Sequence, residues 1–204
     1  HLYHCAEHIA ELADDFQKDL HLGLEPEPLG HFENTVETID FFNKFKEWAR
    51  DNGKNEEIIE QHIGVNYDTC HFALEFNDCA HSLSAFADAG IRISKIHLSN
   101  ALQIDLKKEG SKQAIENFNE PTYLHQVMLL MKDKSVVRFR DIPEFLCNNE
   151  VDLKKVKKAR VHFHIPLYAQ PASPLNSTSN HTTDALEFLW ANPKTCPHLE
   201  METY

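Results

Sequence analysis

The chain has 204 residues, 42% of them hydrophobic and 25% charged, as expected for one globular domain with a buried core. Its formal net charge of −12 repels the phosphate backbone of nucleic acids, so no nucleic-acid partner is expected. No apolar run approaches the roughly 18 residues of a membrane helix, and the five cysteines contain no C-x-x-C pair, so we expect no membrane insertion and a reduced, cytoplasmic protein.

Helices and strands are expected to alternate along the chain. Apolar residues at helical spacing predict a helix over residues 2–19, and residues 21–25 form a short strand that Pro26 ends. The later elements are a helix over 34–48, a strand over 63–67, a helix over 82–89, strands over 91–98 and 161–167, a helix over 183–190 and a strand over 198–203. This order favours a parallel sheet with helices outside, either doubly wound or closed into a barrel.

Two segments interrupt the alternation, and each follows a strand. Within residues 99–158, residues 123–131 and 136–139 are expected to pair as a hairpin, followed by a short helix over 143–147. Residues 168–182 are rich in Pro, Ser, Asn and Thr and are expected to form a loop. Insertions of this kind commonly shape a site at the C-terminal face of a barrel.

Ligand-type side chains stand on one face of each predicted strand, because successive strand residues alternate between faces. These polar faces carry His21, Gly23, Glu25, Asn66, Asp68, Lys95, His97, His162, His164, Glu200 and Glu202. In a barrel they would converge inside, where carboxylates and imidazoles need hydrogen bonds or a shared cation. A divalent metal meets this need, and the donor set suits Zn, Mn, Mg, Co or Fe without separating them.

Four motifs resemble those of a known superfamily. Glu25-Pro-Glu-Pro, Tyr67-Asp-Thr-Cys-His71, Ile96-His-Leu-Ser99 and Leu199-Glu-Met-Glu-Thr203 follow the order and spacing of the last strands of xylose-isomerase-like TIM barrels, which include ketose epimerases and endonuclease-IV-type enzymes. The resemblance implies a TIM (β/α)8 barrel, present here as a partial barrel of about five βα units. It also implies the metal ligands, which are Glu25, Asp68, His97 and Glu202.

Three further strings extend the resemblance over nearly the whole chain. They are Tyr123-Leu-His-Gln126, Arg140-Asp-Ile-Pro143 and Val161-His-Phe-His-Ile-Pro166, and together with the four motifs they resemble the EboE-type family of metabolite-traffic proteins. This implies a single barrel domain over residues 1–204, cut short at both ends, with residues 99–158 and 168–182 inserted at the barrel mouth. The family is linked to moving or processing a small metabolite, with no defined reaction.

The histidines near the expected ligands have more than one interpretation. His71 lies three residues after Asp68 and could hold a second metal, but contact with substrate is expected. His162 and His164 face inward by alternation and could contact substrate, bind a metal or be hydrogen-bonded core residues. These three histidines are therefore candidate substrate-binding residues.

Other polar residues are expected to have structural roles. Glu200 lies one layer below the expected ligands and should form an ion pair with Lys95 or His162. Arg138, in the long insertion, could bind an anionic substrate group, but a surface ion pair is the commoner explanation. His181 is expected at the surface or as a helix cap.

Functions of different classes fit these features. The favoured one is a metal-dependent sugar or polyol isomerase or epimerase linked to metabolite processing, with Glu25 and Glu202 removing and returning a proton. An alternative is a non-catalytic carrier that holds a metabolite for export. Another is a metal-dependent phosphoesterase of the endonuclease-IV-like branch, which needs ligands beyond the four. A small-molecule metabolite is the expected partner, and the sequence is compatible with a homo-oligomer.

Overall fold

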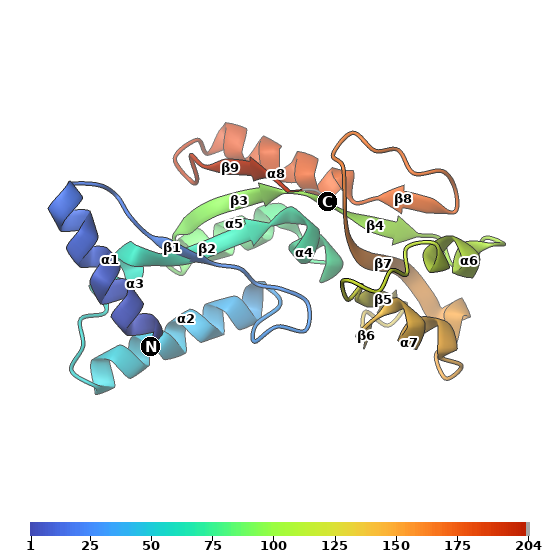
Figure 1. Ribbon diagram of the computed structural model, residues 1–204, viewed down its shortest axis with the longest axis horizontal. Helices are drawn as coiled ribbons and strands as arrows, with labels where there is room; N and C mark the ends of the chain where they lie inside the picture. The colour runs from blue at the N-terminus through green and yellow to red at the C-terminus, as the bar shows by residue number, and fades with distance from the viewer. Residues whose placement is uncertain (203–204) are drawn as a thin grey trace.

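The computed structural model describes residues 1–202 as two sheets with helices packed around them (Figure 1). The strands are β1 (Leu22–Leu24), β2 (Ile63–Asp68), β3 (Ile93–Leu98), β4 (Asn100–Ile104), β5 (Val127–Met131), β6 (Val136–Phe139), β7 (Val156–Ile165), β8 (Leu175–Ser177) and β9 (Leu199–Met201). The helices are α1 (Leu2–Phe16), α2 (Thr35–Asp51), α3 (Glu57–His62), α4 (Thr69–Leu74), α5 (Cys79–Asp88), α6 (Ser111–Glu116), α7 (Ile142–Cys147) and α8 (Ser179–Ala191), with a 3-10 turn, η1, at Leu153–Lys155.

The first sheet confirms the expected parallel arrangement. Its four strands have the order β1-β2-β3-β9, and all neighbours run parallel. Val65, Tyr67 and Ile96 on its apolar face are fully buried, in one core with Phe42 of α2 and Phe86 of α5. Burying an aliphatic or aromatic side chain of this size contributes about 1.5–3 kcal/mol. The alternation read from the sequence therefore determines which face of β2 and β3 the helices cover.

Side-chain caps fix where the helices begin. Asn34 starts α2 and Asp78 starts α5, each accepting a hydrogen bond from a backbone N–H of the first turn. Asp68, the last residue of β2, caps α4 directly, because its Oδ1 accepts from the N–H groups of Cys70 and His71 at 2.5 and 3.3 Å. Each cap contributes about 1 kcal/mol. One oxygen of Asp68 is thus committed to the backbone, and the other is left for the site.

The second sheet has five strands in the order β6-β5-β7-β4-β8, and all of its pairs are antiparallel. The predicted hairpin is confirmed as β5 paired with β6, and α7 follows it as expected. The expectation that residues 161–167 join the parallel strands is wrong, because β7 lies antiparallel between β4 and β5. The apolar pattern of a strand does not show whether its neighbours run parallel or antiparallel to it. The second sheet starts directly after the first, because β4 follows β3 with only Ser99 between them.

The segment expected to be a loop, residues 168–182, is also partly regular. β8 pairs with β4, and α8 begins at Ser179, four residues before the predicted start at Thr183. The last predicted strand, 198–203, appears as β9, and Thr203 lies outside the described residues. Within residues 1–202 no strand pairing closes either sheet into a barrel, and β1 and β9 are the edges of the parallel sheet. No helix in this part of the chain has the length and apolar character needed to cross a bilayer.

Candidate metal centre

The residues predicted as metal ligands lie together at the carboxyl ends of the parallel strands. Asp68 ends β2, His97 is its register partner on β3, and Glu25 and Glu202 directly follow the ends of β1 and β9. One ligand-type atom from each of these four residues lies within 4.8 Å of the others. The parallel register therefore brings together side chains that are up to 177 positions apart in the sequence, from Glu25 to Glu202.

The second oxygen of Asp68 is buried without a hydrogen-bond donor among residues 1–202. Oδ2 lies 3.8 Å from His97 Nδ1, 3.9 Å from His71 Nε2 and 3.9 Å from His164 Nδ1. These distances are too long for hydrogen bonds. Leaving a buried carboxylate oxygen unsatisfied is costly, and a cation between these atoms would supply the missing partner. The donor set therefore fits a divalent cation.

Proton binding in this cluster follows from its charges. Asp68, followed by Glu25 and Glu202, raises the pKa of His97 to about 9, against the opposing effect of burial. Burial would raise the pKa of Asp68, but the neighbouring His71 and His97 hold it well below its usual range. Burial, together with Asp68, raises the pKa of Glu202. A bound cation would therefore replace the proton that His97 holds among the carboxylates.

Asn66 holds one of the carboxylates in place. Its Nδ2 donates to Glu25 Oε2 at 2.7 Å and lies 3.3 Å from His97 Nδ1. Gly23 allows this approach, because a Cβ there would lie 3.1 Å from the Cβ of Ser94 and 3.2 Å from that of Asn66. A larger residue at position 23 would push β1, and with it Glu25, away from β2.

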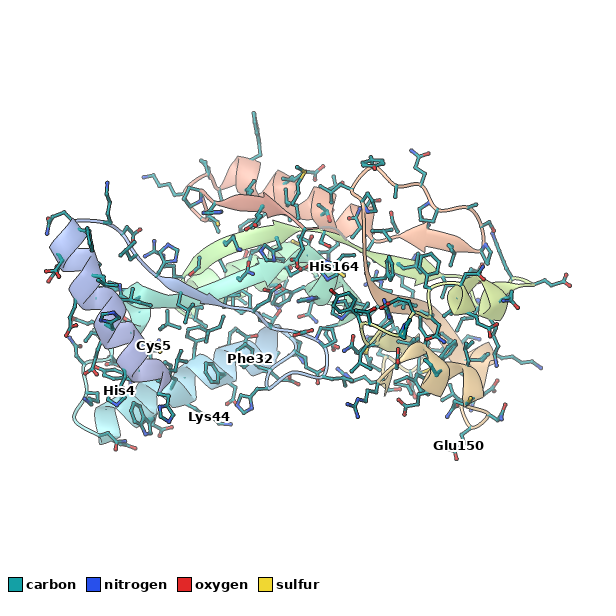
Figure 2. All side chains as sticks on the ribbon, in the orientation of Figure 1. His4, Cys5, Phe32, Lys44, Glu150 and His164 are labelled. Carbon is teal, nitrogen blue, oxygen red and sulfur yellow. The ribbon has the colours of Figure 1, made fainter. Side chains whose placement is uncertain are left out.

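A second group of imidazoles adjoins the cluster through Asp68. His162 Nε2 lies 3.1 Å from the Nε2 atoms of both His71 and His164. The three rings come from α4 and β7, and Figure 2 shows the labelled His164 near the junction of the two sheets. The histidines predicted to bind substrate are therefore brought together beside the predicted metal ligands.

Hydrogen bonds to Nδ1 set the tautomers of two of these rings. His71 Nδ1 donates to the carbonyl of Pro26 at 3.0 Å, and His162 Nδ1 donates to Gln126 Oε1 at 2.7 Å. In the neutral rings Nε2 then carries the lone pair. Ser99 Oγ lies 2.6 Å from Nδ1 of His164 and orients the third ring.

Burial keeps two of these three rings neutral. It holds the pKa of His162 well below its usual range and lowers the pKa of His164 to about 4. In the neutral tautomers the Nε2 lone pairs of His71 and His162 face one another across 3.1 Å and repel unless a proton or cation lies between them, so a second cation could bind here. Cys70 lies near His162 and His164, but burial raises the pKa of its thiol well above the usual value and makes it a poor ligand.

Other predicted roles have mixed outcomes. Glu200 pairs with Lys95 at 2.7 Å, as expected. The expectation that His181 lies at the surface is wrong, because it is 4% exposed and its Nε2 lies 3.0 Å from Tyr67 Oη. His181 lies in the first turn of α8, which packs against α4, α5 and β4, and the buried Tyr67 hydroxyl needs a polar partner. Strand alternation points Tyr67 toward the helices, and this is the signal in the sequence that its hydroxyl needs a buried partner.

Arg138 is occupied by carboxylates of the other part of the chain. It lies on β6 and donates to Glu33 Oε2 at 3.3 Å and to Glu75 Oε2 at 2.5 Å. Burial raises the pKa of Glu75 to about 7, although Arg138 opposes the change, and Glu33 adds to it. This ion-pair network joins the hairpin of the second sheet to α4, which carries His71.

No family model, curated protein or solved structure matches the chain. The resemblance to xylose-isomerase-like barrels and to the EboE-type family therefore stays a prediction based on motifs. The structure establishes an α/β protein with one parallel and one antiparallel sheet, in which buried Asp and His side chains could bind a metal ion.

Proposed function

We propose that the chain is a metal-dependent isomerase or epimerase of sugars or polyols, built on a partial xylose-isomerase-like barrel of the EboE type. The observation that carries this proposal is the convergence of Glu25, Asp68, His97 and Glu202 at the carboxyl ends of four parallel strands. Active sites of barrels and of open α/β sheets lie at this end of the strands. A hydroxy-carbonyl metabolite is the substrate class that suits such a site.

In the proposed reaction, the carboxylates of Glu25 and Glu202 would transfer the proton of the substrate carbon. A bound divalent cation would polarise the carbonyl oxygen of the substrate and so acidify the neighbouring carbon. Glu25 and Glu202 approach from the two edge strands, β1 and β9, so that one can remove the proton and the other can return it. The hydrogen bond from Asn66 orients Glu25, and the raised pKa of Glu202 favours its proton-holding form. His71 and its neighbours would orient the substrate hydroxyl groups.

The test compares Glu202 with Glu187, an exposed glutamate of α8. Metal content is measured by elemental analysis, and turnover is screened on ketoses, aldoses and polyols by mass spectrometry. Glu202→Gln should lower turnover by about 10²–10⁴-fold. Glu187→Gln, at an exposed position of α8, should change it by less than about threefold. Equal effects of the two substitutions would reject the proposal, and a metabolite that co-purifies without turnover would support a carrier instead.

The imidazole group favours metal-dependent phosphoester hydrolysis as a second candidate. His71, His162 and His164 supply the additional ligands that this chemistry requires, and Asp68 faces both groups. Two cations sharing a carboxylate can bind both sides of a phosphate. A stoichiometry of two or more metals per chain, reduced by His162→Asn and accompanied by hydrolysis of nitrophenyl phosphate, would favour this candidate. One metal and no hydrolysis would exclude it.

A further inference from the structure

A cavity of about 430 Å³ lies in the second sheet and shares no residue with the metal centre. Its wall is formed by residues 103–108 at the end of β4, by Leu153 and residues 156–159 around the start of β7, and by residues 174–176 around the start of β8. In Figure 1 this is the end of the second sheet that points away from the parallel sheet. The volume lies within the range of small-ligand sites, about 300–1,000 Å³.

Lysines dominate the charged part of this wall. Lys107, Lys108, Lys157 and Lys158 line the cavity, and Asp105 is the carboxylate that accompanies them. Within residues 1–202 the lysines that form ion pairs with carboxylates are others, namely Lys44, Lys46, Lys54 and Lys95. In a chain of net charge −12, the wall therefore carries a net positive charge.

The surrounding contacts do not relieve this charge. Burial, followed by the charges of Arg160 and Lys157, lowers the pKa of Lys158. Arg160 is buried, with its guanidinium bound to the carbonyl of Ala73 and to Gln103 Oε1, and cannot turn away. Repulsion among these cations persists in the absence of a counter-ion, and a bound anion would remove it.

An apolar surface lies beside the lysines. Ile104, Val156 and Ala159 are at most 4% exposed, and they belong to the core of the second sheet. Leu106, Leu153 and Leu175 extend this surface and are partly buried. A ligand bound here would meet cations and apolar side chains in one cavity.

We propose that this cavity binds an organic phosphate, a doubly charged phosphate group attached to an apolar or aromatic portion. Lysine ammonium groups bind phosphate as point charges, and the partly buried leucines receive the rest of the molecule. The site is independent of the metal centre and of the reaction proposed there.

The test is calorimetric titration of the whole chain with naphthyl phosphate, compared with naphthol and with inorganic phosphate. Naphthyl phosphate should bind at least about tenfold more tightly than either part alone. Lys157→Gln/Lys158→Gln should weaken binding by about tenfold or more. Lys107→Gln/Lys108→Gln, from the part of the wall that follows β4, should do the same. The control Lys154→Gln/Lys155→Gln makes the same charge change just outside the wall and should leave affinity within about twofold.

Three results would overturn the proposal. The first is equal weakening by the control and the wall variants, which indicates general attraction to positive charge. The second is full binding in both wall variants, which places the phosphate elsewhere, such as at the metal centre. The third is no binding at concentrations up to about 1 mM. Circular dichroism of each variant checks that the fold is retained, and the two wall variants provide independent measurements.

Discussion

Replacing Glu75 with Gln should stabilise the protein at pH 8, although the substitution breaks an ion pair with Arg138. The Glu75 side chain is 1% exposed and shares Arg138 with Glu33. Burial raises its pKa to about 7, so the cost of desolvating the carboxylate exceeds the attraction of the guanidinium. The neutral amide of Gln avoids this cost, and Arg138 keeps its contact with Glu33.

The magnitude follows from linkage between protonation and folding. The difference between the ordinary pKa of 4.5 and about 7 corresponds to about 3 kcal/mol. Because the folded-state pKa is raised, the stabilising contribution of Glu75 is complete below pH 4.5 and is lost as the pH rises through about 7. Glu75→Gln should therefore match the unmodified chain at pH 5 and exceed its free energy of unfolding by up to about 3 kcal/mol at pH 8.

Urea denaturation at pH 5, 6, 7 and 8 in the presence of EDTA measures this difference without a contribution from metal binding. Glu33→Gln should also reduce the pH dependence, because the charge of Glu33 contributes to the raised pKa of Glu75. Glu187→Gln, on the exposed face of α8, should change nothing beyond about 0.5 kcal/mol. A Glu75→Gln chain that is less stable at pH 8 would show that the ion pair outweighs desolvation and would refute the reasoning.

Further predictions concern the metal centre. Asp68→Asn keeps an oxygen that can cap α4, but it should abolish the rise in melting temperature that added Zn²⁺ or Mn²⁺ causes. The control Asp105→Asn should retain this rise. A rise in both variants would place the metal elsewhere. Metal affinity should rise by about tenfold per pH unit up to about pH 9, because the metal displaces the proton of His97. Calorimetry in buffers of different ionisation enthalpy should detect the release of this proton. Asn66→Ala should weaken metal binding by about 10–100-fold, and an unchanged affinity with an intact fold would contradict its positioning role.

Strand alternation predicted the part of the site that lies within single strands. Asp68 and His97 end neighbouring parallel strands on faces that the sequence marks as polar, and their partners on the opposite face are buried as expected. The hydrogen bonds that orient the site could not be predicted in this way. Gln126 reaches His162 because β5 and β7 are neighbours, and Ser99 reaches His164 because β4 and β7 pair.

Sequence periodicity also missed the change in strand direction after β3. Ser99 is buried, and the Oγ1 of Thr69 donates to its carbonyl at 2.6 Å, which holds the chain at the point where it leaves the parallel sheet. The short elements α3, α4 and β4 contain too few residues for a periodic pattern to identify them. The start of α4 depends on a single side chain, Asp68, and the motif around it does not by itself identify that residue as a helix cap.

The second sheet belongs to the site, because it supplies the rings that face Asp68. His162 and His164 lie on β7, while His71 lies on α4 of the other part, so the 3.1 Å contact between His71 and His162 exists only if the two parts keep their positions. The bonds from Arg138 to Glu33 and Glu75 join the same two parts a few residues away from His71. The protonation state of Glu75 should therefore affect the imidazole group as well as stability, through the distance between α4 and β7.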